Sequence, residues 1–196
     1  MPRINADALD LEEQVIRTNK VQKTHKGGRT LSWNVLAAVG DRAGHIGVGL
    51  GKARAIPDAI RKSIEAAKRN MMEVPMVGDT IPHEVYVSLG ASVVMLKPAS
   101  PGTGVVAGGA MRPILELAGI RDVLAKSHGS ANPINTAWAT VEALKQLKRA
   151  AHVSSLRGKS IAEMVPWMAK AQALVEEPIA EVETEPEAEA AGTPVE

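Results

Sequence analysis

The stretch RTNKVQKTHKGGRTLSWNVLAAVGDRAGHIGVGLG, residues 17–51, decides the fold of the N-terminal half. Residues 17–26 show no helical stripe and end at Gly27-Gly28, which predicts a strand followed by a turn. Residues 30–39 are apolar enough for a buried central strand, and residues 45–51 follow a short turn as a third strand. The stretch therefore predicts an antiparallel meander.

The third strand carries glycine at every second position. Its other positions are Ile46, Val48 and Leu50, so one face is apolar and the opposite face has no side chains. Glycines on one face of a strand allow another group to approach the backbone closely.

A helix is predicted from Pro57 to about Met72, because proline favours the first helical turn and apolar residues then recur at helical spacing. Its expected core-facing stripe is Ile60, Ile64, Ala67 and Met71. Off that stripe, a cationic band comprises Arg61, Lys62, Lys68 and Arg69. The three strands and this helix predict a β-β-β-α module over residues 11–74.

A second unit is expected over residues 80–152, after a junction that contains Pro75. Its predicted elements are strands near 84–89 and 92–97, a helix near 110–118, a strand near 120–126 and a helix near 134–149. One face of the last helix would comprise Ala137, Val141, Leu144 and Lys148. Its final turns carry Lys145, Lys148 and Arg149, which suit the negative end of a helix dipole.

The C-terminal region divides into two parts. Residues 153–175 are expected to form an extension, with a short helix at 160–174. Residues 176–196 contain eight glutamates and no Lys or Arg, a composition typical of a disordered acidic tail. The formal net charge of +1 therefore hides a basic body: residues 1–175 contain 23 basic and 14 acidic residues, a net charge of +9. Such a body suits an anionic partner.

The strongest charge signal lies in the first two strands. Between Gln14 and Gly40 there is no Asp or Glu. The same stretch carries Arg17, Lys20, Lys23, Lys26 and Arg29 around a glycine turn. An uncompensated basic arm of this kind is what a polyphosphate surface requires. Aromatic residues are scarce, with no Phe in the chain, so nucleic-acid binding would depend on charge, backbone and shape rather than on stacked bases.

Several classes of protein are disfavoured by composition. The chain has no cysteine, which excludes disulfides and thiolate metal sites, and its five histidines are scattered without metal-ligand spacing. No apolar segment is long enough to span a bilayer, and the N-terminus lacks the apolar region of a secretory signal. We expect a soluble cytoplasmic protein with no cofactor, no metal, no membrane partner and no small-molecule substrate.

GTGVVA at 102–107 is the strongest enzyme-like signal, because it matches the G-x-G-x-x-A dinucleotide fingerprint. Pro98 and Pro101 place a stiff loop before the glycines, where the fingerprint needs a direct strand-to-helix turn. A turn that presents backbone amides to a phosphate is the preferred interpretation. A nucleotide-dependent enzyme stays the alternative, and its residues would be Gly102, Gly104 and Asp122. GVGLGKA at 47–53 fails as a P-loop, since Lys52 is followed by Ala53.

Four segments together closely resemble the family of bacterial small ribosomal subunit protein five. They are NKVQKTHKGGR at 19–29, AAVGDRAGHIGVGLGKARAIPDAI at 37–60, KPASPGTGVVAGGAMR at 97–112 and AGIRDVLAKSHGSANPIN at 118–135. The resemblance runs from about residue 11 to residue 160. It implies a two-domain fold of the α+β class, in which the first module is double-stranded-RNA-binding-like and the second domain is a small βαβ-type α/β sandwich. It also implies a structural, non-enzymatic role in the small ribosomal subunit.

The resemblance also implies partners and site residues. Expected partners are small-subunit ribosomal RNA and ribosomal proteins four and eight, near the messenger entry path, with an influence on translational accuracy. The expected RNA-binding residues are Arg17, Lys20, Lys23, Lys26, Gly27, Gly28, Arg29, Lys52, Arg54, Arg61, Lys62, Lys68 and Arg69. The family's spectinomycin sensitivity would involve Lys23, Lys26, Gly27 and Gly28. Contacts with protein four would come from Gly102, Thr103, Gly104 and Arg112. A free-standing double-stranded-RNA regulator is a further alternative.

Overall fold

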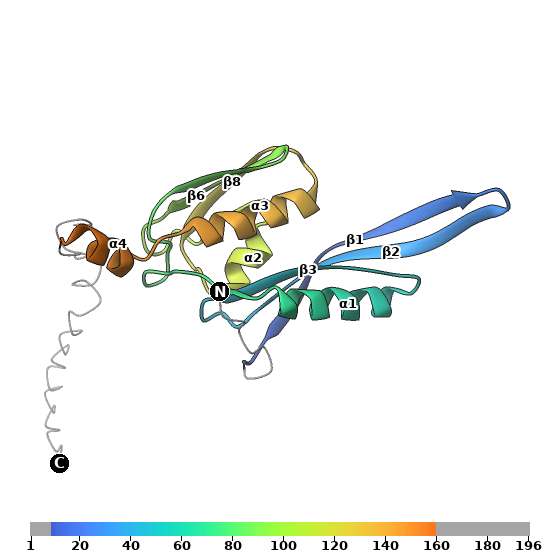
Figure 1. Cartoon of the computed structure of the whole chain (residues 1–196), viewed down its shortest axis with the longest axis horizontal. Helices are drawn as coiled ribbons and strands as arrows, with labels where there is room; N and C mark the ends of the chain where they lie inside the picture. Colours follow the sequence, from blue (N-terminus) through green and yellow to red (C-terminus); the bar gives the residue numbers. More distant parts are fainter. Residues whose placement is uncertain (1–8, 160–196) are drawn as a thin grey trace, which may run out of the picture. The chain divides into compact units, whose positions relative to one another are not determined.

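The computed structural model describes residues 9–159 and contains two four-stranded sheets (Figure 1). The elements in chain order are β1 (Glu12–His25), β2 (Gly28–Gly40), β3 (His45–Ala53), α1 (Ile56–Arg69), β4 (Met72–Glu73), β5 (Val85–Leu89), β6 (Ser92–Pro98), β7 (Val105–Val106), α2 (Arg112–Leu117), β8 (Val123–Gly129), α3 (Pro133–Gln146) and α4 (Ala150–Arg157). The predicted α+β class is confirmed. The division into units at 11–74 and 80–152 stays a prediction.

The first sheet is an antiparallel meander in the order β1-β2-β3-β4. β1 starts five residues earlier than predicted, at Glu12, and has a bulge between Val15 and Arg17. The two-residue strand β4 is too short to leave a sequence pattern and was not predicted. β2 pairs with β1 along its whole length, but with β3 only from Trp33 to Gly40. The far ends of β1 and β2 therefore project as a two-stranded ribbon (Figure 1).

α1 packs on the glycine face of β3. A Cβ added at Gly49 would lie 2.1 Å from the carbonyl oxygen of Ser63, and Gly47 and Gly51 lie equally close to later and earlier carbonyls of α1. The group that approaches the glycines is therefore the chain's own helix. This contact corrects the predicted stripe, since the buried residues of α1 are Ala59, Ser63 and Ala67. Ile60 and Ile64 are only half-buried, because a helix this close to a strand can place only small residues between them.

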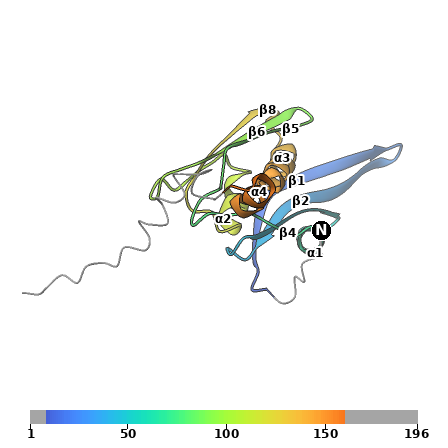
Figure 2. The same cartoon turned by 60° about the vertical axis from the view of Figure 1, so that its left-hand side comes forward.

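The opposite face of the first sheet belongs to a core shared with the second sheet. It contributes Leu36, Ala38, Ile46 and Val48 to one buried cluster that also holds residues of α2, α3, β5 and β6. α2 contacts β2 and β3 of the first sheet and β7 of the second. Figure 2 shows α2 between β2 and the strands β6 and β8. Residues from both sides of the predicted junction are therefore buried in the same core.

The second sheet has the order β5-β6-β8-β7. β7 and β8 are parallel and α2 connects them, which confirms the predicted βαβ-type unit. α3 packs against β5 and β6, where Val87, Val94 and Leu96 are buried. Asn132 caps this helix by accepting a hydrogen bond from the backbone N–H of Ile134 at 3.1 Å.

Backbone hydrogen bonds join the β2–β3 turn to the end of α2. The Arg42 N–H donates to the Leu117 carbonyl at 2.9 Å, and the Gly44 N–H donates to the Ala118 carbonyl at 3.0 Å. Arg42 adopts φ 55°, a left-handed conformation that is uncommon for a residue with a side chain. A Cβ on Gly119 would lie 2.1 Å from the Arg42 carbonyl oxygen, so only glycine fits opposite this turn.

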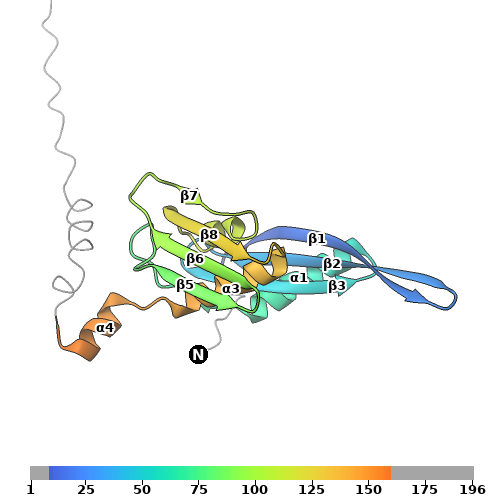
Figure 3. The same cartoon turned by 90° about the horizontal axis from the view of Figure 1, so that it is seen from above.

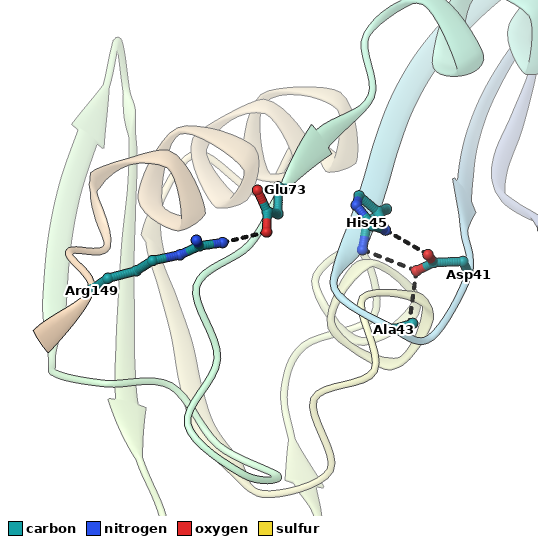
Figure 4. Close-up of polar contacts among 5 residues, drawn as sticks. All are labelled: Asp41, Ala43, His45, Glu73 and Arg149. Atoms are coloured by element: carbon teal, nitrogen blue, oxygen red, sulfur yellow. Dashed lines mark hydrogen bonds and ion pairs between the residues drawn. The ribbon is translucent and has the colours of Figure 1, made fainter. Parts of the chain in front are cut away.

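The prediction of a helix near 134–149 is wrong in its final turn. α3 ends at Gln146, Leu147 is extended, and α4 begins at Ala150. The Lys148 N–H donates to His83 Nε2 at 3.0 Å instead of continuing the helical pattern. Lys148 and Arg149 thus lie outside the helix, and Arg149 forms an ion pair with Glu73 (Figure 4).

The remaining expectations from sequence concern residues outside 9–159, membrane-spanning helices and metal sites. The helix predicted at 160–174 and the acidic tail at 176–196 lie outside the described residues. Within residues 9–159, no helix is long and apolar enough to cross a bilayer. The same residues contain no group of three or more His, Cys, Asp or Glu side chains that could hold a metal ion.

Candidate nucleic-acid interface

The basic arm is the β1–β2 hairpin. His25 pairs with Gly28, so the two turn residues are Lys26 and Gly27, one position earlier than the predicted glycine tip. Every residue from 22 to 31 is exposed. No heavy atom lies within 4 Å of a Cβ position at Gly27 or Gly28, beyond the immediate neighbours. The tip is therefore open on all sides.

The cations of the arm have no acidic partners among the described residues. No ion pair within residues 9–159 involves Arg17, Lys20, Lys23, Lys26 or Arg29. Arg17 donates only a long hydrogen bond of 3.5 Å to Asn19 Oδ1. Because β1 and β2 contain Asp or Glu only at positions 12 and 13, the projecting ribbon has an uncompensated positive charge.

Strand register divides these cations between two faces. Opposite residues in an antiparallel pair project to the same side, and successive residues alternate. Lys23 lies opposite Thr30, and Arg17 shares its face, which is otherwise polar near the tip. Lys20 lies opposite Trp33 on the other face, one step from the exposed Leu31. The arm thus has a polar cationic face and a mixed apolar and cationic face.

The cations of α1 form two rows rather than one band. Successive helical residues are about 100° apart, so Arg61 and Lys68 align on one flank and Lys62 and Arg69 on the other. Asp58 and Glu65 lie between the rows and reduce their charge. Lys68 Nζ is 3.1 Å from a Glu13 carboxylate oxygen, whereas the closest approach of Arg61 to Asp58 is 4.0 Å.

The direction of α1 separates its cations further. Ala59 packs on Gly51 and Ala67 packs on Gly47, so the helix runs antiparallel to β3. Its start therefore lies near the base of the ribbon, together with Lys52 and Arg54, which are exposed. Lys68 and Arg69 lie at the other end. The structure brings together the arm and the start of α1, but not the end of α1.

The GTGVVA loop has an internal structural role. The Asp122 carboxylate is buried and accepts a hydrogen bond from the Gly104 N–H at 2.9 Å. The glycines precede a strand, β7, whereas a dinucleotide fingerprint follows a strand and opens a helix. Asp122, which the enzyme alternative named as one of its residues, therefore closes this loop instead. Gly102 and Thr103 are exposed, and Arg112 pairs with Glu116 at 2.8 Å.

One polar cluster in the β2–β3 turn has a shifted pKa. Asp41 accepts hydrogen bonds from the backbone N–H groups of Ala43 and His45 at 2.8 and 2.9 Å, and its second oxygen lies 2.5 Å from His45 Nδ1 (Figure 4). Burial by itself would raise the pKa of Asp41, but these hydrogen bonds and the His45 charge together lower it below its ordinary value. The cluster fixes the turn that contacts α2.

Two family models match the chain and decide the family. Residues 11–75 match the family described as ribosomal protein S5, N-terminal domain, and residues 87–157 match ribosomal protein S5, C-terminal domain. The chain belongs to the ribosomal protein S5 family. Members of the S5 family are structural components of the small ribosomal subunit and not enzymes. The nucleotide-dependent enzyme considered from sequence is therefore wrong.

Sequence reasoning missed polar side chains on the cationic face of the S5 arm. His25 and Thr30 are exposed on the same face as Lys23. Their placement depends on strand register, which the charge pattern alone does not give. The two-residue turn at Lys26-Gly27 would have provided that register.

Proposed function

We propose that this S5 protein binds folded small-subunit ribosomal RNA through its β1–β2 arm and holds that RNA in place during and after assembly. The observation that carries the proposal is the exposed, acid-free ribbon with an open tip. Its cations would neutralise phosphates and release counterions, and no covalent chemistry would be involved.

The arm cations are the residues best suited to this role. A lysine with no carboxylate partner gains more from a phosphate than one that must first leave an ion pair. By this criterion Lys20, Lys23 and Lys26 rank above Lys68, which contacts Glu13 at 3.1 Å. Gly27 and Gly28 would let RNA approach the turn, since no neighbouring atom occupies that space.

A second group of contacts would come from the base of the ribbon and the start of α1. The residues proposed there are Lys52, Arg54, Arg61 and Lys62. Because α1 packs closely on β3, these cations would be held near the base of the ribbon. Arg69 at the far end of α1 would bind a separate part of the RNA or none.

Protein contacts complete the proposal. The exposed loop with Gly102, Thr103 and Gly104, followed by Arg112, would face ribosomal protein four, and ribosomal protein eight would be a second neighbour. Placement near the messenger entry path would let the protein influence translational accuracy. A cytoplasmic, ribosome-bound location follows from this role.

A filter-binding series over salt concentration tests the electrostatic proposal. About five phosphate contacts, one for each arm cation, predict that the arm alone gives a log–log slope of affinity against salt near −4 for ribosomal RNA. Lys23→Ala should make the slope less steep by about one unit and weaken binding similarly for unrelated RNA sequences, because a phosphate contact carries no sequence information.

Lys145→Ala is the matched control, since Lys145 is an exposed lysine on α3 that pairs with Glu142 at 3.5 Å. It should leave the slope unchanged. A wild-type slope close to zero would refute RNA binding through charge. Equal effects of Lys23→Ala and Lys145→Ala would refute the assignment to the arm.

A further inference from the structure

The chain between α3 and α4 is held by contacts with residues far back in the sequence. We call its three residues, Leu147, Lys148 and Arg149, the linker. Leu147 is buried, and the Lys148 N–H donates a hydrogen bond to His83 Nε2 at 3.0 Å. Arg149 forms an ion pair with Glu73 of β4. Figure 3 shows α4 joined to α3 by the linker, apart from both sheets.

α4 depends on the linker for its orientation. None of its residues is buried, and Leu156 near its end is 73% exposed. No other helix or strand among residues 9–159 packs extensively against it. The contacts of the linker therefore largely set the direction in which α4 leaves α3.

Both ring nitrogens of His83 form hydrogen bonds, and their partners fix the protonation of the ring. Nδ1 lies 2.9 Å from the Glu84 carbonyl oxygen, which can only accept, so Nδ1 carries a proton. Nε2 faces the Lys148 N–H, which can only donate, so Nε2 carries none. The ring is therefore the neutral Nδ1–H tautomer. A protonated ring would direct a second N–H at the Lys148 N–H, and two donors cannot form a hydrogen bond.

The loop that carries His83 is anchored independently of the linker. Ile81 and Pro82, which precede the half-buried ring, are themselves buried. Earlier in the loop, the Asp79 carbonyl accepts hydrogen bonds from two backbone N–H groups, those of Arg121 and Asp122. Loss of the Lys148 hydrogen bond would therefore release the linker and leave the loop in place.

The charged side chains of the surrounding elements are mostly paired. Glu84 of the loop lies 3.5 Å from Lys97 of β6, and Glu142 lies 3.5 Å from Lys145 near the end of α3. Glu73 pairs with Arg149, whereas the Lys148 side chain is exposed and has no ion pair within residues 9–159. His152 on α4 is a second exposed imidazole. Between about pH 5 and 8 only histidines among these groups change charge, and of the two only His83 bonds to the linker.

We propose that His83 is a proton-sensitive latch on the linker. While the ring is neutral, its hydrogen bond to Lys148 fixes the linker and with it α4. Proton uptake removes that hydrogen bond and leaves the pair of Arg149 with Glu73, which is more than half exposed and contributes little. The latch is closed at the upper end of the range in which histidine titrates and opens as the pH falls through that range. It depends on the fold alone and would operate whether or not the arm binds RNA.

Nuclear magnetic resonance on the full chain tests the latch directly. At pH 8 the His83 ring nitrogens should show the Nδ1–H tautomer. Between pH 8 and pH 5.5, protection of the Lys148 amide from hydrogen exchange should fall about tenfold, because one backbone hydrogen bond is lost.

His83→Gln is the matched variant, since its amide oxygen can accept from Lys148 but does not titrate. Protection of the Lys148 amide should then be the same at both pH values, and His83→Phe should lack it at both. A proton on Nε2 at pH 8, constant Lys148 protection in wild type, or an equal fall in His83→Gln would overturn the proposal.

Distances between spin labels test the release of α4. The chain has no cysteine, so Lys145→Cys on α3 and Leu156→Cys on α4 provide two unique labelling sites, both exposed. Electron paramagnetic resonance should give a narrow distance distribution at pH 8 and a broader one at pH 5.5. Adding His83→Gln should keep the distribution narrow at both. An unchanged width without that substitution, or the same broadening with it, would refute the latch.

Discussion

Two groups of glycines in the first sheet have opposite surroundings. Gly47, Gly49 and Gly51 of β3 lie against the backbone of α1, closer than any side chain would permit. Gly27 and Gly28 at the arm tip have no neighbour within 4 Å of a Cβ position. The first group is required by packing inside the chain, and the second leaves space for something outside it. Glycine content alone does not reveal a binding site; the surroundings of each glycine do.

Charged groups show the same difference between the arm and the rest of the described residues, here called the body. In the body, Asp41 has three hydrogen-bonding contacts within its own turn. In the arm, Lys20, Lys23 and Lys26 have no acidic partner among the described residues. Groups satisfied inside the fold should affect stability when changed, and groups left unsatisfied should affect binding. Four predictions test the effects on stability, from the largest expected effect to the smallest.

Gly49→Ala should destabilise the protein by about 3 kcal/mol, because the new methyl group would overlap the Ser63 carbonyl and separate α1 from β3. Urea unfolding followed by circular dichroism measures the free energy of unfolding. A protein that no longer folds at 25 °C gives the same conclusion. Wild-type stability in Gly49→Ala would contradict the close packing of α1.

Asp41→Asn should cost about 2 kcal/mol at neutral pH, since it removes charge-assisted hydrogen bonds to a buried carboxylate. Folding lowers the pKa of Asp41, so its contribution is fully present above its ordinary pKa and is lost as the pH falls through the lower folded pKa. The stabilities of wild type and variant should therefore converge at acid pH. Urea unfolding between pH 7 and pH 2 measures this, and a constant difference would count against it.

Gly27→Ala and Gly28→Ala form a matched pair at the arm tip. Gly28 has φ 145°, where a side chain is strained, so Gly28→Ala should cost about 1 kcal/mol. Gly27 has neither a positive φ nor a close neighbour, so Gly27→Ala should stay within about 0.5 kcal/mol of wild type. Thermal unfolding distinguishes them. A large effect at Gly27 would show that the tip has contacts beyond those described.

Arg149→Ala should have the smallest effect, at most about 0.5 kcal/mol. Its ion pair with Glu73 is more than half exposed on both sides, and such pairs contribute little. Raising the salt concentration should remove the difference from wild type, which calorimetry can follow. A loss above about 2 kcal/mol would mean that an exposed contact in the body matters as much as a buried one.

Sequence reasoning predicted the elements whose patterns are long. The meander, the helix after Pro57 and the basic arm consist of elements of nine or more residues. The buried face of α1 was predicted from Ile60 and Ile64, although the glycines of β3 require small partners. The matching spacing of Ala59, Ser63 and Ala67 was present in the sequence and indicates the correct face once the strand is considered with the helix.

Other features depend on contacts between distant residues. Nothing in Leu147-Lys148-Arg149 is unfavourable in a helix, and the break there coincides with a hydrogen bond to His83 far back in the chain. The strands β4 and β7 have two residues each, too few for any periodicity. In the candidate site, the lack of acidic residues between Gln14 and Gly40 was enough to identify the arm cations from sequence. The ion pair of Lys68 and the two faces of the ribbon required strand register and side-chain positions.

The buried cluster beneath both sheets has a consequence for how the protein can be divided. Each sheet supplies part of a single interior, and the β2–β3 turn is bonded to the end of α2. A fragment ending near residue 80 would expose Leu36, Ile46 and Val48 to solvent and would tend to aggregate. Heating should melt residues 9–158 in one cooperative step, and synthesis on the ribosome would leave the first half incomplete until the second emerges.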